Sequence, residues 1–380
     1  MGHPSPLWTS GPAYLRAMRP DRPVFFVSPG DLGRTASRLM RGFPGLVSYA
    51  LKANPDPVIL ENLSAAGIGA FDVASPAECR LVRSVVKGAT LHYNNPVRSP
   101  AEIVQALRLG VRSFSVDRVG ELAKLASLAT GPEIEISVRL ALPVGGAAYE
   151  FGTKFGASPD LATHLLAEVA KSGFTPSMTF HPGTQCTDPA AWETYISACA
   201  RIANRAGVRL WRLNVGGGFP SNRRQGAPTD IEAIFTAIRR AVAREFSADA
   251  PALLCEPGRA LVADSIALAT RIRAIGDKSE VFLNDGVYGG LAEAPSIGLS
   301  DRLLAVSPFG ARLCGPSKPR KLFGPTCDSL DTLPGNPSLP VALKEGDYLI
   351  FLGAGAYSAA LATGFNGYGG HERITVMRLA

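Results

Sequence analysis

The stretch "LVSYALKANPD", residues 46–56, raises the question that decides the fold. A short apolar, β-like segment ends at Lys52, and Ala-Asn-Pro follows at once, which predicts a strand that stops at a sharp turn. A lysine at the end of an apolar strand can lose its water shell and its proton, and the neutral amine is a nucleophile. A surface lysine that follows a strand by chance is the simpler interpretation, and this stretch alone favours it.

Seven more segments of the same kind follow, and helical patterns separate them. One of these patterns, "PAECRLVRSVVKG" (76–88), begins with Pro-Ala-Glu, ends at glycine and carries apolar residues three and four apart. The eight predicted strands are residues 46–52, 69–75, 90–95, 113–117, 133–140, 177–183, 212–218 and 252–258. Strand alternating with helix in this way predicts a parallel (β/α)8 barrel over residues 25–262, with a doubly wound sheet as the alternative.

The sequence changes character after residue 262, where long helical patterns stop. The segments 265–276, 280–290, 339–357 and 373–379 are predicted strands, and Gly, Asp and Asn supply the turns between them. We therefore predict a second, all-β domain made of residues 1–24 and 263–380.

Composition excludes several classes of protein. The 380 residues are 46% hydrophobic and 19% charged, which is ordinary for a globular chain with room for two domains. The net charge of +7 is spread without a dense Lys/Arg block, so we predict no nucleic-acid partner. The N-terminus lacks the pattern of a signal peptide, and no apolar run is long enough to span a bilayer. The six cysteines have no CxxC or metal-ligand spacing, which predicts reduced thiols, a cytoplasmic protein and no metal site.

Polar residues follow most of the predicted barrel strands, where such barrels carry their chemistry. Taken one at a time, these residues have simpler explanations, such as a helix cap, a surface ion pair, a core histidine or a plain turn. Their shared position favours a functional site. The residues are Lys52, Asp72, Asn94, Asn95, Asp117, Arg139, His181, Gly216–Gly218 and Glu256.

These side chains meet the needs of one cofactor. The amides of Gly216–Gly218 can face a phosphate with no Cβ in the way, and "EPGR" (256–259) adds another glycine and an arginine. Lys52 offers an amine, His181 a flat ring, and Glu256 an anion for the far end of a planar ligand. Pyridoxal phosphate requires a Schiff-base lysine, a phosphate cup and a carboxylate at the pyridine nitrogen.

Seven motifs resemble, in order, those of the ornithine/lysine/diaminopimelate decarboxylase family, the fold-type III enzymes that use pyridoxal phosphate. The resemblance covers about residues 24–370 and implies an alanine-racemase-like barrel, a β domain and a homodimer with shared active sites. The motifs are "YALKAN" (49–54), "FDVAS" (71–75), "FHPGTQ" (180–185), "NVGGGFP" (214–220), "EPGR" (256–259), "GPTCDSLD" (324–331) and "GAYSAALATGFNG" (355–367).

The resemblance implies a role for each residue that holds the cofactor. Lys52 forms the Schiff base, His181 stacks on the ring, and Glu256 keeps the pyridine nitrogen protonated. Asp72 and Arg139 lie behind the ring and the lysine. The residues implied to hold the phosphate are Thr184, Gly216, Gly217, Gly218, Gly258, Arg259 and Tyr357.

The resemblance also implies residues that act on the substrate. Cys327 returns a proton to the carbon that has lost carbon dioxide, and a thiol suits such proton transfer. Asp328 and Tyr288 meet the substrate together with Cys327, and Cys327 and Asp328 reach the cofactor of the other subunit. Lys154 and Asp331 resemble a pair that forms a salt bridge between the two subunits.

The substrate is predicted in outline only. Aspartate after the cysteine suits a distal ammonium, because a buried cation needs a paired anion. Ornithine-specific relatives carry a second acid where this chain has Ile297, with Glu293 and Asp301 four residues to either side. We therefore expect ornithine, lysine or a related or modified amino acid, as in polyamine biosynthesis.

Three alternatives remain. Fold-type III racemases carry, by resemblance, an arginine in place of Glu256, so the glutamate favours decarboxylation over racemisation. A catalytically inactive regulatory paralogue would not be expected to keep Lys52, Glu256, Cys327 and Tyr357 together. A nucleic-acid-binding protein would need an aromatic-basic motif, and the sequence has none.

Overall fold

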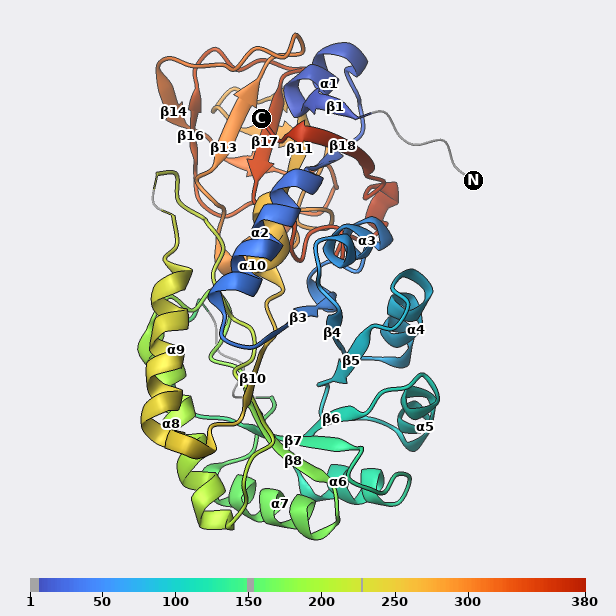
Figure 1. Cartoon of the computed structure of the whole chain (residues 1–380). Coiled ribbons are helices and arrows are strands. Elements are labelled where there is room, and N and C mark those ends of the chain that lie inside the picture. The colour runs from blue at the N-terminus through green and yellow to red at the C-terminus, as the bar shows by residue number, and fades with distance from the viewer. Residues whose placement is uncertain (1–6, 149–153, 227) are drawn as a thin grey trace. The chain divides into compact units, whose positions relative to one another are not determined.

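The structure is a computed structural model that describes residues 7–148, 154–226 and 228–380. Contacts divide the chain into two units, and Figure 1 labels most of their elements. The first unit comprises Met1–Thr35, Ser221–Pro228 and Arg259–Ala380, and the second comprises Ala36–Pro220 and Thr229–Gly258. The sequence-based domains, 25–262 and the rest, have similar but not identical limits.

The second unit is a closed barrel of eight parallel strands, in the order β10-β3-β4-β5-β6-β7-β8-β9. Each predicted strand overlaps one strand of this barrel, so the predicted (β/α)8 barrel is confirmed and the doubly wound alternative is wrong. The strands are β3 (Leu46–Ala50), β4 (Ala70–Val73), β5 (Thr90–Tyr93), β6 (Ser113–Val116), β7 (Glu135–Leu140), β8 (Thr175–Phe180), β9 (Arg212–Asn214) and β10 (Ala252–Cys255).

Helices follow the strands and begin where the sequence provides caps. Asp56 accepts a hydrogen bond from the backbone of Val58, and Ser99 and Glu102 form a capping box. Gly207 ends its helix in the left-handed conformation, with φ of 65°. The helices are α2 (Pro29–Gly42), which begins in the first unit, α3 (Pro57–Ala65), α4 (Pro76–Val85), α5 (Pro100–Arg108), α6 (Val119–Ala126), α7 (Pro159–Lys171), α8 (Pro189–Ala206) and α9 (Ile231–Phe246), with the 3₁₀-helices η1 (Leu51–Ala53) and η2 (Ser247–Asp249).

The first unit is built on an eight-stranded sheet in which β1, β18, β2, β11, β12 and β15 follow one another, and β17 pairs with β11 and β13. β2, which lies at the predicted domain boundary and was expected either to join the β domain or to lead into the barrel, pairs with β11 and β18 of this sheet. The strands are β1 (Trp8–Ser10), β2 (Val24–Val27), β11 (Ile266–Ile275), β12 (Val281–Leu283), β13 (Leu303–Val306), β15 (Leu322–Phe323), β17 (Tyr348–Leu352) and β18 (Glu372–Arg378), with β14 (Ser317–Pro319) and β16 (Ser338–Pro340) forming a separate pair.

This unit is β-rich, which confirms the predicted β domain, and short helices join its strands. In α1, Ser10 accepts a hydrogen bond from the backbone of Ala13 and Pro12 stands in the first turn, so local capping is enough to form a helix. The helices are α1 (Gly11–Met18), α10 (Arg259–Val262) and α11 (Ala294–Ile297), with η3 (Ala263–Ser265) and η4 (Phe365–Gly367).

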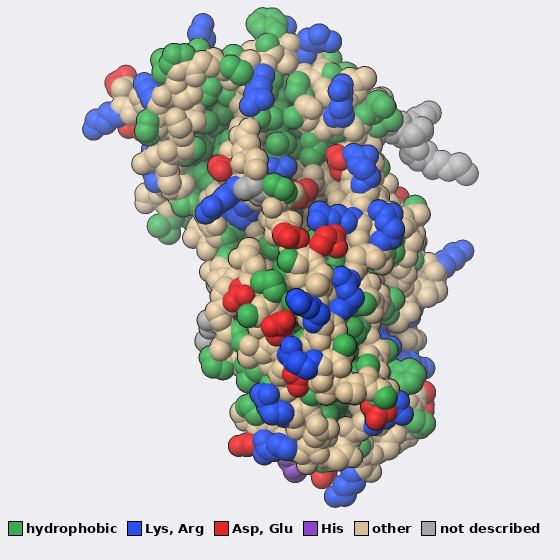
Figure 2. Space-filling view, turned by 60° about the vertical axis from the view of Figure 1, so that its left-hand side comes forward, with side chains coloured by type: hydrophobic (Ala, Val, Ile, Leu, Met, Phe, Trp, Pro, Cys, Tyr) green, Lys and Arg blue, Asp and Glu red, His purple; other side chains and the backbone are tan. Residues whose placement is uncertain are grey.

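The surface carries both signs of charge. On the face drawn in Figure 2, basic and acidic side chains lie interspersed, in keeping with the diffuse charge expected from the sequence. Within the described residues, no helix is both long enough and apolar enough to cross a membrane.

Candidate active site

A cavity of about 440 Å³ opens at the carboxyl ends of the barrel strands. We call this end of the barrel the carboxyl-terminal mouth. All of the residues that line the cavity belong to the second unit, and most of the polar strand-end residues expected from the sequence are among them. The residues are Lys52, Asp72, Ala74, Asn94, Asn95, Pro96, Arg139, Lys154, Phe155, Thr179, Phe180, His181 and Glu256.

Lys52 reaches the cavity because the chain turns tightly after β3. The backbone N–H of Ala50 donates to the carbonyl of Pro257 at 3.3 Å, and the N–H of Asn54 donates to that of Leu51 at 3.0 Å. The residues on both sides of Lys52 are buried, while Lys52 itself is exposed. The protein therefore fixes the backbone of the lysine without burying its amine, contrary to the expectation of a lysine stripped of water.

Two carboxylates share one side-chain amide at the base of the cavity. Nδ2 of Asn94 donates to Oδ1 of Asp72 at 3.2 Å and also to Oε1 of Glu256. Nδ2 of Asn214 donates to the same oxygen of Glu256 at 2.5 Å. Asn214 was not expected in the site, although it opens the motif "NVGGGFP", and Asn94 was noted only as a polar strand end.

Both acids resist ionisation in this setting. Burial raises the pKa of Asp72 well above its usual range, and the negative charge of Glu256 raises it further. Burial also raises the pKa of Glu256, and this outweighs the hydrogen bond from Asn214 and the attraction of Lys52 and Arg139. A cationic group bound beside these acids would therefore be stabilised.

His181 presents a neutral ring to the same cavity. Its Nδ1 accepts a hydrogen bond from the backbone N–H of Gly183 at 3.1 Å. Burial lowers the pKa of His181 well below its usual range, and the positive charges of Lys52 and Arg139 lower it further. An uncharged, flat imidazole is suited to stacking on a planar ligand.

The glycines after β9 have a packing reason as well as the predicted binding role. Gly216 and Gly218 have positive φ angles of 69° and 83°. A Cβ at Gly216 would lie 2.0 Å from the carbonyl oxygen of Phe180, and one at Gly218 would lie 2.2 Å from that of Gly183. Among the described residues, the N–H groups of Gly217 and Gly218 donate no hydrogen bond. These two amides are suited to binding a phosphate. Phosphate binding by these glycines, by Thr184 and by Gly258 stays a prediction.

Arg259 and Tyr357 lie together in the first unit. The guanidinium carbon of Arg259 is 5.0 Å from the ring centre of Tyr357, and the buried guanidinium forms an ion pair with Glu293. Glu293 was noted in the sequence only as an acid near Ile297. Its contact with Arg259 joins the first residue of α10 to the residue that precedes α11, a long-range pairing that no local sequence pattern predicts.

Cys327, Asp328 and Tyr288 form a second cluster in the first unit. Cys327 and Asp328 line a cavity of about 430 Å³. The hydroxyl of Tyr288 donates to Oδ2 of Asp328 at 2.5 Å, and this bond is the main reason that the pKa of Asp328 is lowered. The thiol of Cys327 is exposed and donates to Oδ1 of Asn366 at 3.4 Å. Asn366, in "ATGFNG", was not expected to contact the cysteine.

Comparison with known proteins identifies the family. Residues 30–263 match the family described as pyridoxal-dependent decarboxylase, pyridoxal binding domain. The chain belongs to the pyridoxal-dependent decarboxylase family. Lysine/ornithine decarboxylase of Selenomonas ruminantium is 33% identical over 331 residues, which cover 85% of this chain and 81% of that protein.

Two further relatives show the breadth of the family. Antizyme inhibitor 2 of Xenopus laevis is 31% identical over 376 residues, covering 92% of this chain and 80% of that protein. The structure of arginine decarboxylase from Paramecium bursaria Chlorella virus superposes with a TM-score of 0.84 at 25% identity, covering 94% of this chain and 96% of the viral one. The predictions of a pyridoxal phosphate-dependent decarboxylase and of its cofactor are thereby confirmed.

The donor set of the carboxyl-terminal mouth fits pyridoxal phosphate. The exposed amine of Lys52 suits the cofactor's aldehyde, the neutral ring of His181 suits its face, and Glu256 suits a protonated ring nitrogen. The raised pKa of Glu256 supports this fit, because a buried carboxylate gains most from a cation placed beside it.

The two acids nearest in sequence to the position of the second acid expected of ornithine decarboxylases are both engaged in other contacts. Ile297 ends α11. Of the two acids on either side, Glu293 pairs with Arg259, and Oδ1 of Asp301 accepts the N–H of Gln225 at 2.7 Å. Each acid is thus engaged within the first unit of the decarboxylase.

The predicted salt bridge between Lys154 and Asp331 of two subunits stays a prediction. Lys154 is exposed and lines the carboxyl-terminal mouth, with its Nζ 5.0 Å from the ring centre of Phe155. Asp331 is 2% exposed and accepts hydrogen bonds from the backbone of Val287 and Thr326. Little of this carboxylate is therefore left for a partner subunit.

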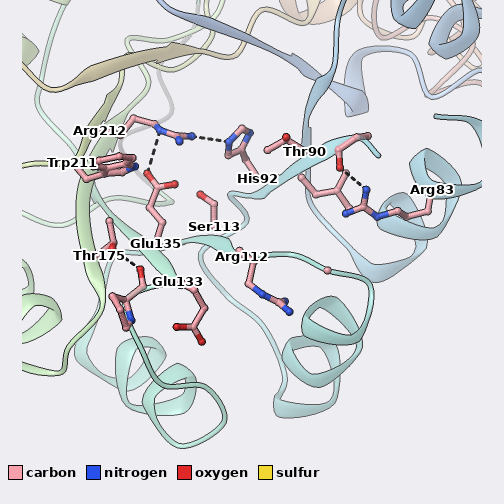
Figure 3. A pocket seen from close by; sticks show the side chains of 14 residues that line it. Arg83, Thr90, His92, Arg112, Ser113, Glu133, Glu135, Thr175, Trp211 and Arg212 are labelled. Carbon is pink, nitrogen blue, oxygen red and sulfur yellow. Dashed lines mark hydrogen bonds and ion pairs between the residues drawn. The ribbon is translucent and has the colours of Figure 1, made fainter. Parts of the chain in front are cut away.

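A second cavity of the barrel, of about 540 Å³, lies at the amino ends of the strands, which we call the amino-terminal mouth (Figure 3). Nη1 of Arg212 lies 2.8 Å from Nε2 of the buried His92, and Nε of Arg212 lies 3.5 Å from Oε1 of Glu135. Nδ1 of His92 lies 3.1 Å from the hydroxyl oxygen of Ser48, and Ser177 donates to Glu135 at 2.7 Å. The side chains satisfy one another across five strands, which is typical of a structural layer.

Proposed function

We propose that this decarboxylase converts a basic amino acid, ornithine, lysine or a close relative, into an amine and carbon dioxide. The observation that carries the proposal is the ionised Asp328, held by Tyr288 beside Cys327. An anion in a pocket favours a substrate with a distal cation. Relatives named for lysine, ornithine and arginine decarboxylation support the same class of substrate.

The residues of the barrel hold and tune the cofactor. When bound, pyridoxal phosphate supplies a ring that accepts the electron pair left by departing carbon dioxide. Lys52 would hold the cofactor through its amine, and the tight turn after β3 fixes the backbone that carries this lysine. Glu256 keeps a proton on the ring nitrogen, and the amides of Asn94 and Asn214 fix the orientation of its carboxylate.

The residues of the first unit act on the substrate. Asp328 binds the distal ammonium, and Tyr288 fixes the carboxylate that does so. The thiol of Cys327 holds the proton that replaces carbon dioxide on the substrate carbon, and Asn366 orients this thiol. The chain gives one proton and one carbon–hydrogen bond forms for each carbon–carbon bond broken.

We further propose a homodimer in which Cys327 and Asp328 serve the barrel of the partner copy. The family resemblance supports this arrangement, and so does the exposure of Cys327 and of Leu330, whose side chain is 73% exposed beside them. We also place the protein in the cytoplasm, since all six cysteines are unpaired.

A screen of amino acids tests this function. Purified protein with pyridoxal phosphate is incubated with lysine, ornithine, arginine and neutral amino acids, and carbon dioxide and amine are measured, with Lys52→Ala as the blank. We expect release from at least one basic amino acid and from none of the neutral ones. An inverted amino acid without carbon dioxide would identify a racemase. A protein that binds no cofactor would be a regulatory relative, as similarity to an antizyme inhibitor allows.

A further inference from the structure

Asp331 occupies an enclosed position between two segments of the first unit. Its side chain is 2% exposed. Oδ1 accepts the N–H of Val287 at 2.9 Å, and Oδ2 accepts both the N–H of Thr326 at 3.0 Å and its hydroxyl at 2.8 Å. Both oxygens therefore receive donors from the chain's own segments 286–290 and 324–328.

Two glycines leave the space that this carboxylate fills. A Cβ at Gly286 would lie 2.1 Å from Oδ1 of Asp331, and a Cβ at Gly324 would lie 2.1 Å from the same atom. The backbone adds a further link, because the N–H of Gly324 donates to the carbonyl of Asp331 at 2.8 Å. The position is thus shaped for a carboxylate by two segments that both precede Asp331 in the sequence.

The two segments carry the residues that we assign to the substrate. Val287 precedes Tyr288, and Thr326 precedes Cys327. The hydroxyl of Tyr288 in turn binds Asp328, so the segments meet twice, once at Asp331 and once at Asp328. Joining the two segments fixes Cys327 and Asp328 relative to Tyr288.

We propose that Asp331 is a positioning residue that locks the Cys327–Asp328 loop onto the Tyr288 segment of its own subunit. The proposal rests on the proposed function of Cys327 and Asp328. It gives Asp331 a role different from the salt bridge to Lys154 that the family resemblance implies. A carboxylate is required because three donors point at it, and asparagine would turn an N–H of its own toward one of them.

The main test compares Asp331→Asn with the wild-type holoenzyme. We expect unchanged affinity for pyridoxal phosphate, because the cofactor-binding residues of the barrel are untouched. We expect kcat to fall on the order of a hundredfold, as small misplacements of catalytic groups can cause. A larger share of turnovers should end in the aldehyde and aminated cofactor, formed with water, because a displaced thiol fails to protonate the substrate carbon.

A matched control is Asp347→Asn in the same unit. Asp347 is also buried, at 5% exposure, and accepts a backbone N–H, from Lys344 at 2.7 Å. It contacts neither of the two segments that Asp331 joins, so we expect its variant to keep the wild-type kcat and product ratio. An equal loss in both variants would mean that any buried carboxylate of this unit matters equally, and would overturn the proposal.

Thiol chemistry provides a readout that does not depend on decarboxylation. Cys314 and Cys327 are both exposed, so the alkylation rate of Cys327 can be measured relative to Cys314 by peptide mass spectrometry. We expect this ratio to change at least threefold in Asp331→Asn. This readout holds even if the wild type releases no carbon dioxide, in which case the proposed function fails but the positioning role is still decided.

Two further measurements close the test. If Asp331→Asn does not fold, Thr326→Val removes only the hydroxyl donor, and we expect a smaller shift of the same two ratios. Sedimentation separates positioning from an intersubunit bridge, because a bridge predicts a weakened dimer whose activity returns at high protein concentration. That recovery, or wild-type product and alkylation ratios in the variants, would overturn the proposal.

Discussion

The two mouths of the barrel contain the same kinds of side chain, but their acids differ in how well neighbouring groups stabilise the charged form. Each has a buried or partly buried histidine, an arginine and an acid, namely His181, Arg139 and Glu256 at one end and His92, Arg212 and Glu135 at the other. At the amino-terminal mouth, Arg212 lies between the histidine and the acid and contacts both. At the carboxyl-terminal mouth, two acids share the amide of Asn94 and have raised pKa values.

The difference shows how a binding site can be distinguished from a network that only stabilises the fold. The amino-terminal network closes on itself, so adding a ligand would break contacts that already exist. The carboxyl-terminal acids are incompletely compensated, so a cation placed there gains free energy. Cavity size does not separate the two mouths, since their cavities have similar volumes of about 540 and 440 Å³.

The largest expected effect separates the mouths by removing the amine. Lys52→Ala should lower decarboxylation on the order of 10⁴-fold or more, because a residue that binds covalently has no substitute. It should also abolish the visible absorbance of the bound cofactor. Steady-state assays and absorbance spectra of the purified variant check both outcomes. Full activity in this variant would refute the assignment of the carboxyl-terminal mouth.

The next effect compares the two glutamates directly. Glu256→Gln should lower kcat on the order of 10²- to 10³-fold, the scale of losing one electrostatic contact to the reacting system. Glu135→Gln should leave kcat within a fewfold of the wild type, because its partners Arg212 and Ser177 lie at the other mouth. Assays of both variants with saturating cofactor decide the matter. Equal losses of kcat would erase the distinction between the mouths.

The amino-terminal mouth should show itself in the pH dependence of stability. Burial and the charge of Arg212 lower the pKa of His92 from 6.5 to about 3. Between these two pH values the unfolded chain therefore binds more protons than the native protein. The contribution of His92 to the free energy of unfolding is fully present above pH 6.5 and is lost as the pH falls toward 3. Between pH 6.5 and 4.5 the loss due to His92 is about 2 to 3 kcal/mol, at about 1.4 kcal/mol per pH unit.

Urea unfolding of His92→Gln and wild type at both pH values measures this loss. The variant should lose less free energy of unfolding on acidification, whatever its stability at neutral pH. His164→Gln, at an exposed position, should behave as the wild type does. If acid sensitivity were unchanged in His92→Gln, the buried neutral histidine would not be what holds this mouth together near neutrality.

Local sequence signals predicted the barrel because each carries its physics in a few residues. Strand ends, Pro and Ser or Asp at helix starts, and glycine at helix ends are short-range features, and Lys52, His181 and Glu256 stand directly beside them. The contacts that tune the site are long-range. Asn94 and Asn214 meet Glu256 only because β5, β9 and β10 close into a barrel, and no spacing along the chain encodes that meeting.

The first unit shows the same limit more strongly. The motif "GPTCDSLD" pointed to Cys327 and Asp328 but not to the segment that holds them. The contacts of Asp331 with Val287 and of Arg259 with Glu293 join residues more than thirty positions apart. Such pairings depend on how the sheet packs, and motifs along the chain do not show them. The family resemblance therefore implied Lys154 as the partner of Asp331, whereas backbone N–H groups of the same chain already bind this carboxylate.

The smallest effect tests whether the uncompensated acids cost stability. The raised pKa of Asp72 means that the native state binds more protons than the unfolded one above its usual pKa of 3.8, so this group's contribution to the free energy of unfolding falls as the pH rises. Asp72→Asn keeps an acceptor for Asn94 without the charge. It should stabilise the cofactor-free protein by about 1 kcal/mol at pH 7, with a smaller gain at pH 5, because sites selected for function are often costly in stability.

Urea unfolding of cofactor-free protein at the two pH values measures the gain. The contrasting variant is Asp117→Asn, since Asp117 is buried but paired with Arg118 at 2.7 Å and accepts the N–H of Gly156 at 2.9 Å. That change should lower the free energy of unfolding, because it removes a compensated charge and leaves its partners without it. If Asp72→Asn were the less stable of the two, the acids at the carboxyl-terminal mouth would be as well compensated as the rest of the barrel, and the contrast between the mouths would rest on their position alone.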